Sequence, residues 1–523
     1  MFADSAVLAW ALANVAALAA PPPSPSPSPD ASVPAEVSRL RATVDAARGV
    51  RPKTERVIEQ LTENGRTHKR TIVHVGDDVR VTDEDGPFTT MYGTSGGRAW
   101  RQNANGLTVL DQPRNGAEAH ERRTVSLQHV TSPIEADVIV DVNAKGDGTK
   151  TFVDPATHRV VRSERITPNE TTVTTYDDFR RTGGYELAWH EHSDDGQPAD
   201  DVDERIVSIE SSGITTADVE IARPRRSLVT FPTGTTTTKL PVTLDENTHF
   251  VARIRIGARG YDFIVDTGAA NGIAIDADTA RGLGLTLYAQ GSNAANAGRY
   301  VQSEAIVPEM DVGALTMRDV VVKVIPALHF ENRSGTSRVV GLLGFDFIAS
   351  LSLTFDYEKG EITATDYDAY VNPSGPDTFA VPIRLGRQGP ETDLVLDGHL
   401  GEGFEIDTGG TGGVLISDVF TRRYPGITRG FEGGSRHVEL MGVGGTFYAT
   451  MYLVPEMKLG PLVFKKFLAL VLDSDRTYSG GSFDGIIGPD VLKHFTMTTD
   501  YADSTLYFTP NSLGRSARVP AKP

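Results

Sequence analysis

The chain contains the same series of short motifs twice, and this repeat limits its possible fold more than any other feature. The segment FIVDTGAANGIAI, which contains Asp266, recurs as FEIDTGGTGGVLI, which contains Asp407, at an offset of 141 (407 − 266). VPEM then recurs at 147 (454 − 307), and an apolar segment with glycine recurs at 144 (485 − 341). Ordered matches exclude chance, and their small drift is what loop insertions produce. The repeat predicts two homologous lobes, at residues 240–370 and 379–510.

Each copy of Asp-Thr-Gly follows a largely apolar segment, residues 261–265 in the first lobe and 404–406 in the second, which we interpret as a buried strand. An ionisable residue directly after a buried strand is costly unless it has partners or a function. Because duplication gives pseudo-two-fold symmetry, the simplest assembly brings the two loops together on the axis. Asp266 and Asp407 are therefore expected to face each other.

The neighbours of these aspartates support the same arrangement. Gly268 and Gly409 remove side chains where the chain must turn tightly and another backbone comes close. Thr267 and Thr408 supply hydroxyl groups that can bond across the two-fold interface.

Paired carboxyl groups predict a particular chemistry. Two carboxylates about 3 Å apart cannot both ionise comfortably, so they share one proton and titrate as a coupled pair. One can take a proton from water while its twin hydrogen-bonds the scissile carbonyl oxygen, which hydrolyses an amide without a covalent intermediate. The 523 residues include no cysteine, so disulfides, cysteine-ligated zinc and a cysteine nucleophile are excluded.

These motifs resemble those of the aspartic peptidases. The residues that carry the resemblance are Asp-Thr-Gly at 266–268 and 407–409 and the apolar-apolar-Gly elements at 342–344 and 486–488. The two lobes look like tandem retropepsin-like domains fused into one chain, similar to pepsin. The resemblance implies a mostly β, bilobal fold with two pseudo-two-fold-related β-barrel lobes. It also implies that Asp266 and Asp407 are catalytic.

The resemblance further implies interlocking threonines at 267 and 408, and a β-hairpin flap between the Asp motif and VPEM in at least one lobe. Candidate flaps are residues 290–301 and 442–448, near which lie Tyr300 and Tyr448. Each tyrosine is either a packing residue or a substrate contact.

One departure from the family has a chemical consequence. Pepsin-like enzymes carry Ser or Thr directly after Asp-Thr-Gly, where this chain has Ala269 and Gly410. Retroviral-type enzymes resemble this chain in having Ala there. Without that hydroxyl the carboxyl pair loses a hydrogen bond that favours its anion, so we expect an optimum in weak rather than strong acid.

The N-terminus has the pattern of an export signal. Residues 1–20 contain an apolar run too short to span a bilayer, followed by small residues, although a positive start is missing. An uncleaved membrane anchor and a misassigned start are the alternatives. Residues 21–34 are a Pro/Ser-rich linker. We expect a periplasmic or secreted protein.

Residues 35–222 predict an accessory domain, mostly β with some α. A helical pattern begins at Ala35 and a second short helical run is expected at residues 57–61, after which short alternating strands dominate. The layout resembles the half-barrel domains related to periplasmic lipoprotein carriers, which implies a concave apolar face for a lipid or peptide. A structural or targeting domain with a filled core is the alternative. Linkers at 223–239 and 371–378 and a tail at 511–523 complete the division.

A metal site and nucleic-acid binding are both disfavoured. His190 and His192 share a strand face, as zinc ligands would, but no third ligand is evident. The acidic stretch from Asp194 to Glu204 lacks the spacing of an EF-hand. With 51 basic and 69 acidic side chains and no basic run, the chain is unsuited to phosphate backbones. We expect no cofactor and no metal.

The sequence thus predicts an exported, monomeric aspartic endopeptidase that acts on polypeptides. The alternative is a non-catalytic protein that binds a peptide or an apolar ligand in the same cleft and in the carrier-like domain.

Overall fold

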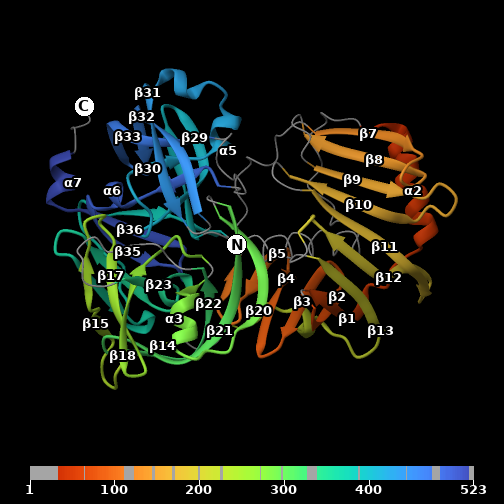
Figure 1. Cartoon of the computed structure of the whole chain (residues 1–523), viewed down its shortest axis with the longest axis horizontal. Coiled ribbons are helices and arrows are strands. Elements are labelled where there is room, and N and C mark those ends of the chain that lie inside the picture. The colour runs from red at the N-terminus through yellow and green to blue at the C-terminus, as the bar shows by residue number, and fades with distance from the viewer. Residues whose placement is uncertain are drawn as a thin grey trace. The chain divides into compact units, whose positions relative to one another are not determined.

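The computed structural model describes residues 33–517, apart from 64, 111–122, 144–147, 168–170, 198–200, 224–227, 271, 296–297, 327–337, 387–388, 443–444 and 474–482. The expected signal segment and most of the Pro/Ser-rich linker lie outside the described residues. The chain forms two compact units (Figure 1). Of the described residues, 33–104 and 123–223 form the N-terminal unit, and 105–110 and 228–517 form the C-terminal unit. No helix among the described residues is long and apolar enough to cross a membrane.

The N-terminal unit is one helix and an antiparallel sheet (Figure 1). The sheet order is β5-β4-β3-β2-β1-β13-β12-β11-β10-β9-β8-β7, so that the first strand meets the last at the centre. The elements are α2 (Ala35–Arg48), β1 (Thr54–Glu63), β2 (Arg66–Val75), β3 (Asp78–Asp85), β4 (Phe88–Ser95), β5 (Arg98–Gln102), β7 (Arg123–Val130), β8 (Ala136–Asn143), β9 (Gly148–Val153), β10 (Val160–Ile166), β11 (Thr171–Thr182), β12 (Tyr185–Asp194), β13 (Val202–Glu210) and the 3₁₀ turn η1 (Thr216–Val219).

The second helical run expected at residues 57–61 is wrong, because this segment lies within strand β1. Val57, Glu59 and Leu61 are buried in alternation, which is the period of a strand. Pairing with β2 on one side and β13 on the other satisfies the backbone along the segment. The apolar spacing was compatible with either structure, and long-range pairing decided between them.

Charged side chains are buried in the N-terminal unit beside apolar ones. Arg70 is 2% exposed, and its guanidinium lies 2.7 Å from Asp83 and 2.9 Å from Glu204. Glu55 and Glu59 are also buried, on the face of β1 that carries Val57.

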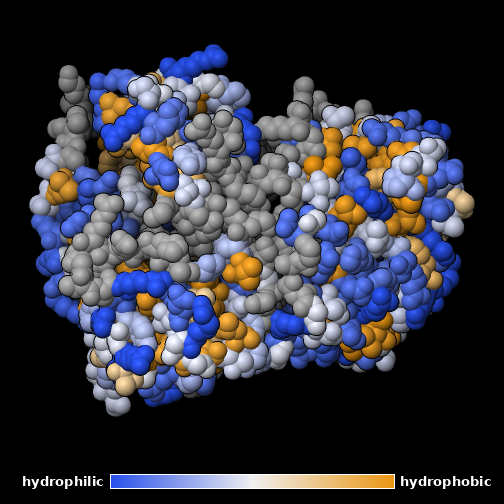
Figure 2. Space-filling view, in the orientation of Figure 1, coloured by the Kyte–Doolittle hydropathy of each residue, from blue (hydrophilic) through white to orange (hydrophobic). Residues whose placement is uncertain are grey.

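At the surface shown in Figure 2, hydrophobic residues are interspersed with hydrophilic ones rather than gathered in one area. Such isolated apolar side chains are ordinary for a protein surface.

The first lobe of the C-terminal unit is built on the sheet β14-β22-β19-β23-β18-β17-β21-β20, with β16 paired to β17. Its elements are β14 (Val229–Thr230), β16 (Val242–Leu244), β17 (Phe250–Ile256), β18 (Arg259–Val265), β19 (Ile273–Asp276), α3 (Ala277–Gly282), β20 (Tyr288–Ala295), β21 (Gly298–Val312), β22 (Leu315–Ile325), β23 (Val339–Leu343) and α4 (Phe345–Ile348).

The second lobe is built on the sheet β27-β28-β29-β34-β30-β33-β32-β31. Its elements are β27 (Arg384–Gly386), β28 (Gly389–Leu396), β29 (His399–Ile406), β30 (Val414–Ile416), α5 (Asp418–Arg423), the 3₁₀ turn η3 (Ile427–Gly430), β31 (Glu432–Gly442), β32 (Gly445–Leu459), β33 (Leu462–Leu472), β34 (Gly485–Ile487), α6 (Pro489–Leu492) and α7 (Ser512–Ala517).

The two sheets share their strand pairings. β18 runs parallel to β23 and β29 runs parallel to β34, and the parallel pair β19 and β22 has its counterpart in β30 and β33. β19 and β23 are antiparallel, as are β30 and β34. All five residues of β23 are buried, as is typical of a strand with a layer on each face.

A third sheet, β15-β25-β24-β35-β36-β26, joins the two lobes. Thr354 of β24 lies opposite Thr498 of β35, and their hydroxyl oxygens are 3.0 Å apart. These two threonines are separated by 144 residues (498 − 354), the offset of the nearest repeated motif, so a local two-fold axis passes between them. The strands are β15 (Thr237–Lys239), β24 (Ser352–Asp356), β25 (Glu361–Thr365), β26 (Phe379–Pro382), β35 (Phe495–Asp500) and β36 (Thr505–Pro510), with the 3₁₀ turn η2 (Tyr367–Ala369).

Residues 105–110, which include β6 (Thr108–Leu110), cluster with the C-terminal unit, whereas the sequence analysis places them in the accessory domain. The side-chain amide of Asn105 exchanges hydrogen bonds with the backbone of Val321 and donates to Asp346 at 2.5 Å. Asn105 is 3% exposed, and Val109 joins the large apolar core of this unit. Asn105 contacts this unit through its side-chain amide rather than through strand pairing, and such a contact leaves no periodic pattern in the sequence.

Candidate active site

Both Asp-Thr-Gly loops begin where a strand leaves its parallel partner. The N–H of Asp266, directly after β18, donates to the carbonyl of Leu343 at 3.0 Å. The N–H of Asp407, directly after β29, donates to the carbonyl of Ile487 at the same distance. The repeated apolar-apolar-Gly elements thus anchor the two aspartates in the same way.

The two threonines interlock reciprocally. The N–H of Thr267 donates to the hydroxyl of Thr408 at 3.0 Å, and the N–H of Thr408 donates to the hydroxyl of Thr267 at 2.9 Å. Each hydroxyl then donates across the interface, Thr267 to the carbonyl of Ile406 at 2.6 Å and Thr408 to that of Val265 at 2.7 Å. In a two-fold contact each group meets its own equivalent, and this network has that form.

The structure brings Asp266 and Asp407 together, with the carboxyl group of each packed against the Asp-Thr-Gly glycine of the opposite loop. Asp266 is 8% exposed, and its Oδ1 accepts the N–H of Gly268 at 2.8 Å. Oδ1 of Asp407 accepts the N–H groups of Gly409 and Gly410, each at 2.8 Å. Burial, the charge of Asp407 and the hydrogen bond to it raise the pKa of Asp266 well above its ordinary value.

The glycines are required by the approach of the opposite carboxyl group. A Cβ added to Gly268 would lie 2.6 Å from Cγ of Asp407, and one added to Gly409 would lie 2.3 Å from Cγ of Asp266. Both distances are shorter than any normal carbon contact, so the motif needs glycine at each position.

Each lobe has a hairpin between its Asp-Thr-Gly and its VPEM. β20 and β21 pair up to Ala295 and Gly298, and β31 and β32 pair up to Gly442 and Gly445. The tips, at 296–297 and 443–444, lie outside the described residues, as do the side chains of 289–290, 292–299 and 441–445.

The two candidate tyrosines take different places. Tyr300 packs against an apolar cluster that includes Ile264 and Leu342. In the second lobe Phe447, rather than Tyr448, joins the corresponding cluster, which includes Leu415. The offset of 147 between the VPEM motifs relates Tyr300 to Phe447 (447 − 300), and the sequence analysis missed this residue.

Sequence reasoning also missed two residues beside the aspartates. Nε2 of His249 lies 2.8 Å from the carbonyl oxygen of Gly410. Glu405 is 5% exposed, and its Oε1 has no hydrogen-bond partner among the described residues. Burial and the charges of Asp407, Glu391 and Asp266 raise the pKa of Glu405 well above its ordinary value. A charge inside the otherwise apolar segment 404–406 was the available signal for Glu405, whereas no local pattern marks His249.

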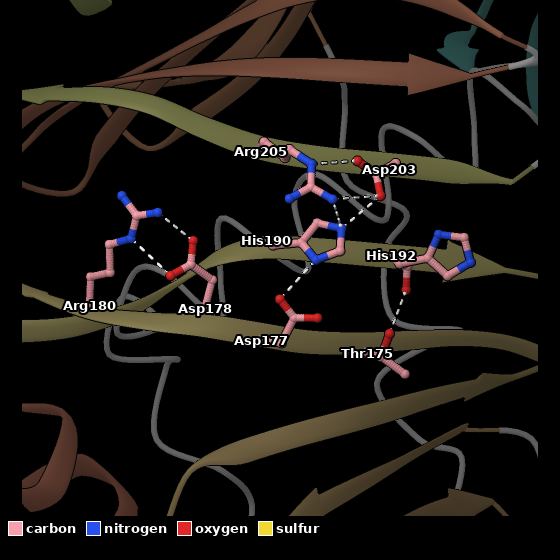
Figure 3. A network of polar contacts seen from close by, with 8 residues as sticks. All are labelled: Thr175, Asp177, Asp178, Arg180, His190, His192, Asp203 and Arg205. Atoms are coloured by element: carbon pink, nitrogen blue, oxygen red, sulfur yellow. Dashed lines mark hydrogen bonds and ion pairs between the residues drawn. The ribbon is translucent and has the colours of Figure 1, made fainter.

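His190, considered above as a zinc ligand, lies in an ion-pair network on β11, β12 and β13 (Figure 3). Its ring nitrogens lie 2.8 Å from Asp177 and 2.6 Å from Asp203, and Arg205 approaches the second nitrogen at 3.0 Å. Burial lowers the pKa of His190, but the hydrogen bonds to the two carboxylates outweigh it and raise the pKa. His192 meets Thr175 only through its backbone carbonyl in this view. Within the described ranges, no three His, Asp or Glu side chains are grouped to hold a metal.

Comparison with known proteins identifies one domain by sequence. A family model described as aspartyl protease matches residues 252–347, which include Asp266 and the β18–β23 pair. The sequence of this segment is therefore similar to that of aspartyl protease domains. No curated protein matches the chain.

Several solved structures resemble about a third of the chain. They include a DUF1329 family protein from Desulfovibrio piger, at 11% identity over 36% of this chain and 98% of that one, with a TM-score of 0.27. A LolA superfamily protein from Nitrosomonas europaea matches at 9% identity over 35% and 96%, with a TM-score of 0.27. An outer membrane lipoprotein-sorting protein domain from Vibrio parahaemolyticus matches at 12% over 35% and 95%, with a TM-score of 0.26.

Proposed function

We propose that this protein is an aspartic endopeptidase that hydrolyses polypeptides with a water molecule held between Asp266 and Asp407. The observation that carries the proposal is the facing of the two aspartates, each directly after its own buried strand and each with its carboxyl group against the glycine of the opposite loop. The reciprocal bonds of Thr267 and Thr408 support it, because they hold both loops in one arrangement. The match of residues 252–347 to an aspartyl protease domain supports the same chemistry.

In the proposed reaction the pair carries one negative charge and one proton. The charged carboxylate takes a proton from the water, and the resulting oxygen nucleophile forms a bond to the peptide carbonyl carbon. The protonated carboxyl gives its proton to the carbonyl oxygen, which produces a neutral diol. The newly protonated carboxyl then gives its proton to the peptide nitrogen while a hydroxyl of the diol returns a proton to the other carboxylate, so that the C–N bond breaks and the products are an acid and an amine. No electron is gained or lost by the protein, and the pair returns to its starting charge.

Catalysis explains the paired carboxyls better than binding alone. Holding two facing carboxyl groups in a buried site costs free energy, because the ionised form of each is disfavoured by burial and by its twin. A site that only binds a peptide or an apolar ligand has no need of this arrangement. The two hairpins are proposed to cover the bound polypeptide, with Tyr300 and Tyr448 as candidate contacts.

The test is cleavage of a peptide library between pH 4 and 8 by the full chain and by Asp266→Asn and Asp407→Asn. We expect each variant to lose about a thousandfold of the activity or more, because either change removes the shared proton or the base. Asp368→Asn, which changes an exposed aspartate of the same unit, is the matched control and should retain full activity. Activity in either Asp266→Asn or Asp407→Asn at the level of that control would refute the assignment.

The same assay separates the alternative function. A protein that captures peptides without cutting them, with equal affinity in both Asn variants, would be a binding protein.

We also propose export from the cytoplasm, with the accessory unit as a positioning or inhibitory module. Determining the N-terminal residue of the protein recovered outside the cytoplasm tests this, and cleavage near residue 20 is the expected result.

A further inference from the structure

His249 lies in the turn between β16 and β17 and reaches the loop that carries Asp407. Asp245 organises the turn, since its Oδ1 accepts the N–H groups of Asn247 at 2.9 Å and of His249 at 2.8 Å. Nδ1 of His249 lies 3.2 Å from Oδ2 of Asp245, and Nε2 lies 2.8 Å from the carbonyl oxygen of Gly410. His249 is 4% exposed, so water does not compete strongly for these contacts.

The contacts require both ring nitrogens of His249 to donate. A carbonyl oxygen and an ionised carboxylate are acceptors only, and a neutral imidazole has a single N–H group. Burial lowers the pKa of His249, but the bonds to Asp245 and Gly410 and the charges of Asp245 and Asp407 outweigh it and raise the pKa. Burial raises the pKa of Asp245, but the bonds from His249 and Asn247 outweigh it and lower the pKa. The two groups therefore form an ion pair.

Gly410 links this ion pair to the candidate active site. Its carbonyl accepts from His249, and its N–H donates to Oδ1 of Asp407 at 2.8 Å. Among the described residues, the titratable groups whose charges act on the His249 ring are Asp245, from its own turn, and Asp407, from the loop after β29.

At the loop of Asp266, the position that corresponds to His249 is a glycine. Val251 of β17 pairs with Ile264, and Glu391 of β28 pairs with Glu405. Ile264 and Glu405 occupy the same place in the repeat, so Val251 corresponds to Glu391. His249, two residues before Val251, therefore corresponds to Gly389. Gly389 has no side chain to place a charge beside the loop of Asp266. The two Asp loops thus share the threonine contacts but differ in charge, because the His249 cation lies beside the loop of Asp407 and a glycine takes the matching position at the loop of Asp266.

We propose that His249, held by Asp245, is a positioning residue that places the negative charge of the pair on Asp407 and the shared proton on Asp266. The inference rests on the proposed peptidase function. Asp407 is then the base that activates water, and Asp266 is the acid that protonates the carbonyl oxygen. A nearby cation favours the charged form of a carboxyl group, which gives the direction of the effect.

Kinetics provide the first test. In His249→Gln the amide N–H can still donate to Gly410, but the charge is lost. We expect the acidic limb of the kcat/KM profile to move to higher pH by about one unit, with KM little changed. In His249→Leu both the bond and the charge are lost, and kcat should fall about tenfold further. A purely structural role would lower activity equally at every pH and leave the limb in place.

Titration of the His249 ring by NMR tests the charge assignment without any cleavage. The probe is the full chain with ¹⁵N-labelled histidine, in which the His249 signals are those missing from His249→Gln. Both ring nitrogens should carry protons at neutral pH. Asp407→Asn should lower the His249 pKa by about one unit, whereas Asp266→Asn should leave it unchanged.

The outcomes of this titration are separable from those of the peptidase assay. Equal shifts in Asp407→Asn and Asp266→Asn, or no shift in either, would overturn the proposed placement of charge even if the enzyme cleaves peptides. The expected pattern in a protein that cleaves nothing would preserve the placement of charge and refute the peptidase function. Asn is nearly isosteric with Asp, and unchanged thermal unfolding of both variants establishes that they are folded.

Discussion

The two lobes of the C-terminal unit share their strand pairings and their Asp-Thr-Gly contacts but differ in what surrounds the contacts. On the first lobe, Val251 and Ile264 form an apolar pair across β17 and β18. At the matched register of the second lobe, the buried pair is Glu391 and Glu405. His249 has its counterpart in Gly389, as described above. The contacts around the aspartate pair are symmetric, while each lobe has its own electrostatic environment.

This difference separates contacts that equivalent residues of both lobes make with each other from contacts that a residue of only one lobe makes. The threonine and glycine positions contact their own equivalents, so a change in either copy damages the shared centre. Glu405 and His249 act from one side only, so a change there alters the balance between the two aspartates without removing either. Substitutions at matched positions can therefore separate shared from one-sided effects.

The largest expected effect comes from the shared glycines. Gly268→Ala and Gly409→Ala should each reduce kcat about a thousandfold, because the new Cβ would lie within 2.6 Å and 2.3 Å of the opposite carboxyl carbon. Gly282→Ala is the control, since a Cβ there would have no neighbour within 4 Å. Peptide cleavage and thermal unfolding measure the two consequences. If only one of the two glycines proves sensitive, the centre is less symmetric than its contacts indicate.

The interlocking threonines come next. Thr267→Val and Thr408→Val each remove a hydroxyl that bonds a buried carbonyl and a buried N–H group, which should lower the free energy of unfolding by about 2–3 kcal/mol. The two losses should be equal, because the contacts are reciprocal. Calorimetry of the full chain measures them, and Thr243→Val, at an exposed position, should change little. Unequal losses would show that one loop is held mainly by other contacts.

Much of this shared centre could be predicted from the sequence. Asp-Thr-Gly is a local motif, and its repetition in register fixes the facing of Asp266 and Asp407 through symmetry alone. One-sided features could not be predicted in this way. His249 and Gly410 are 161 residues apart, and their contact depends on the turn at Asp245.

The other differences between the sequence-based predictions and the structure also have specific physical reasons. Residues 57–61 have an apolar spacing that fits a helix, and only the pairing of β1 with two distant strands decides for a strand. Phe447 could have been found, because the second offset of 147 relates it to Tyr300. Glu405 could also have been found, since the sequence places a charge in a strand whose first copy has Ile264.

Glu405 should make the stability of the second lobe depend on pH. Its folded pKa is raised, so the folded state keeps a proton that the unfolded chain has lost. Its contribution is complete below its unfolded pKa of about 4.5 and decreases as pH rises from there toward the raised folded pKa. Glu405→Ile, which copies the first lobe, should raise the free energy of unfolding at pH 7.5 by about 1–2 kcal/mol and have less effect at pH 4.5.

Calorimetry of the full chain at the two pH values checks this, with Glu432→Gln as an exposed control on β31. A stabilisation by Glu405→Ile that is the same at pH 4.5 and pH 7.5 would show that improved packing, and not removal of an ionisable group, is responsible.

The smallest expected effect concerns the residue after each Asp-Thr-Gly, where the lobes again differ. Ala269→Ser adds a hydroxyl at a position that already has a Cβ, and this hydroxyl can donate to a carboxylate oxygen of Asp266. The bond favours the anion of Asp266, the proposed acid, so the basic limb of the activity profile should move to lower pH by less than about one unit. The unmodified enzyme should have its optimum in weak acid.

Gly410→Ser is the matched change in the other lobe and should behave differently. Its Cβ would lie 2.7 Å from Oδ2 of Asp407, so the loop must shift before the hydroxyl can bond, and activity should fall at every pH. The difference follows from the missing Cβ at Gly410, and the contact of its carbonyl with His249 holds the loop against the required shift. If both serine variants shift the profile equally without loss of rate, the second loop is as adaptable as the first, and the asymmetry between the lobes does not extend to this position.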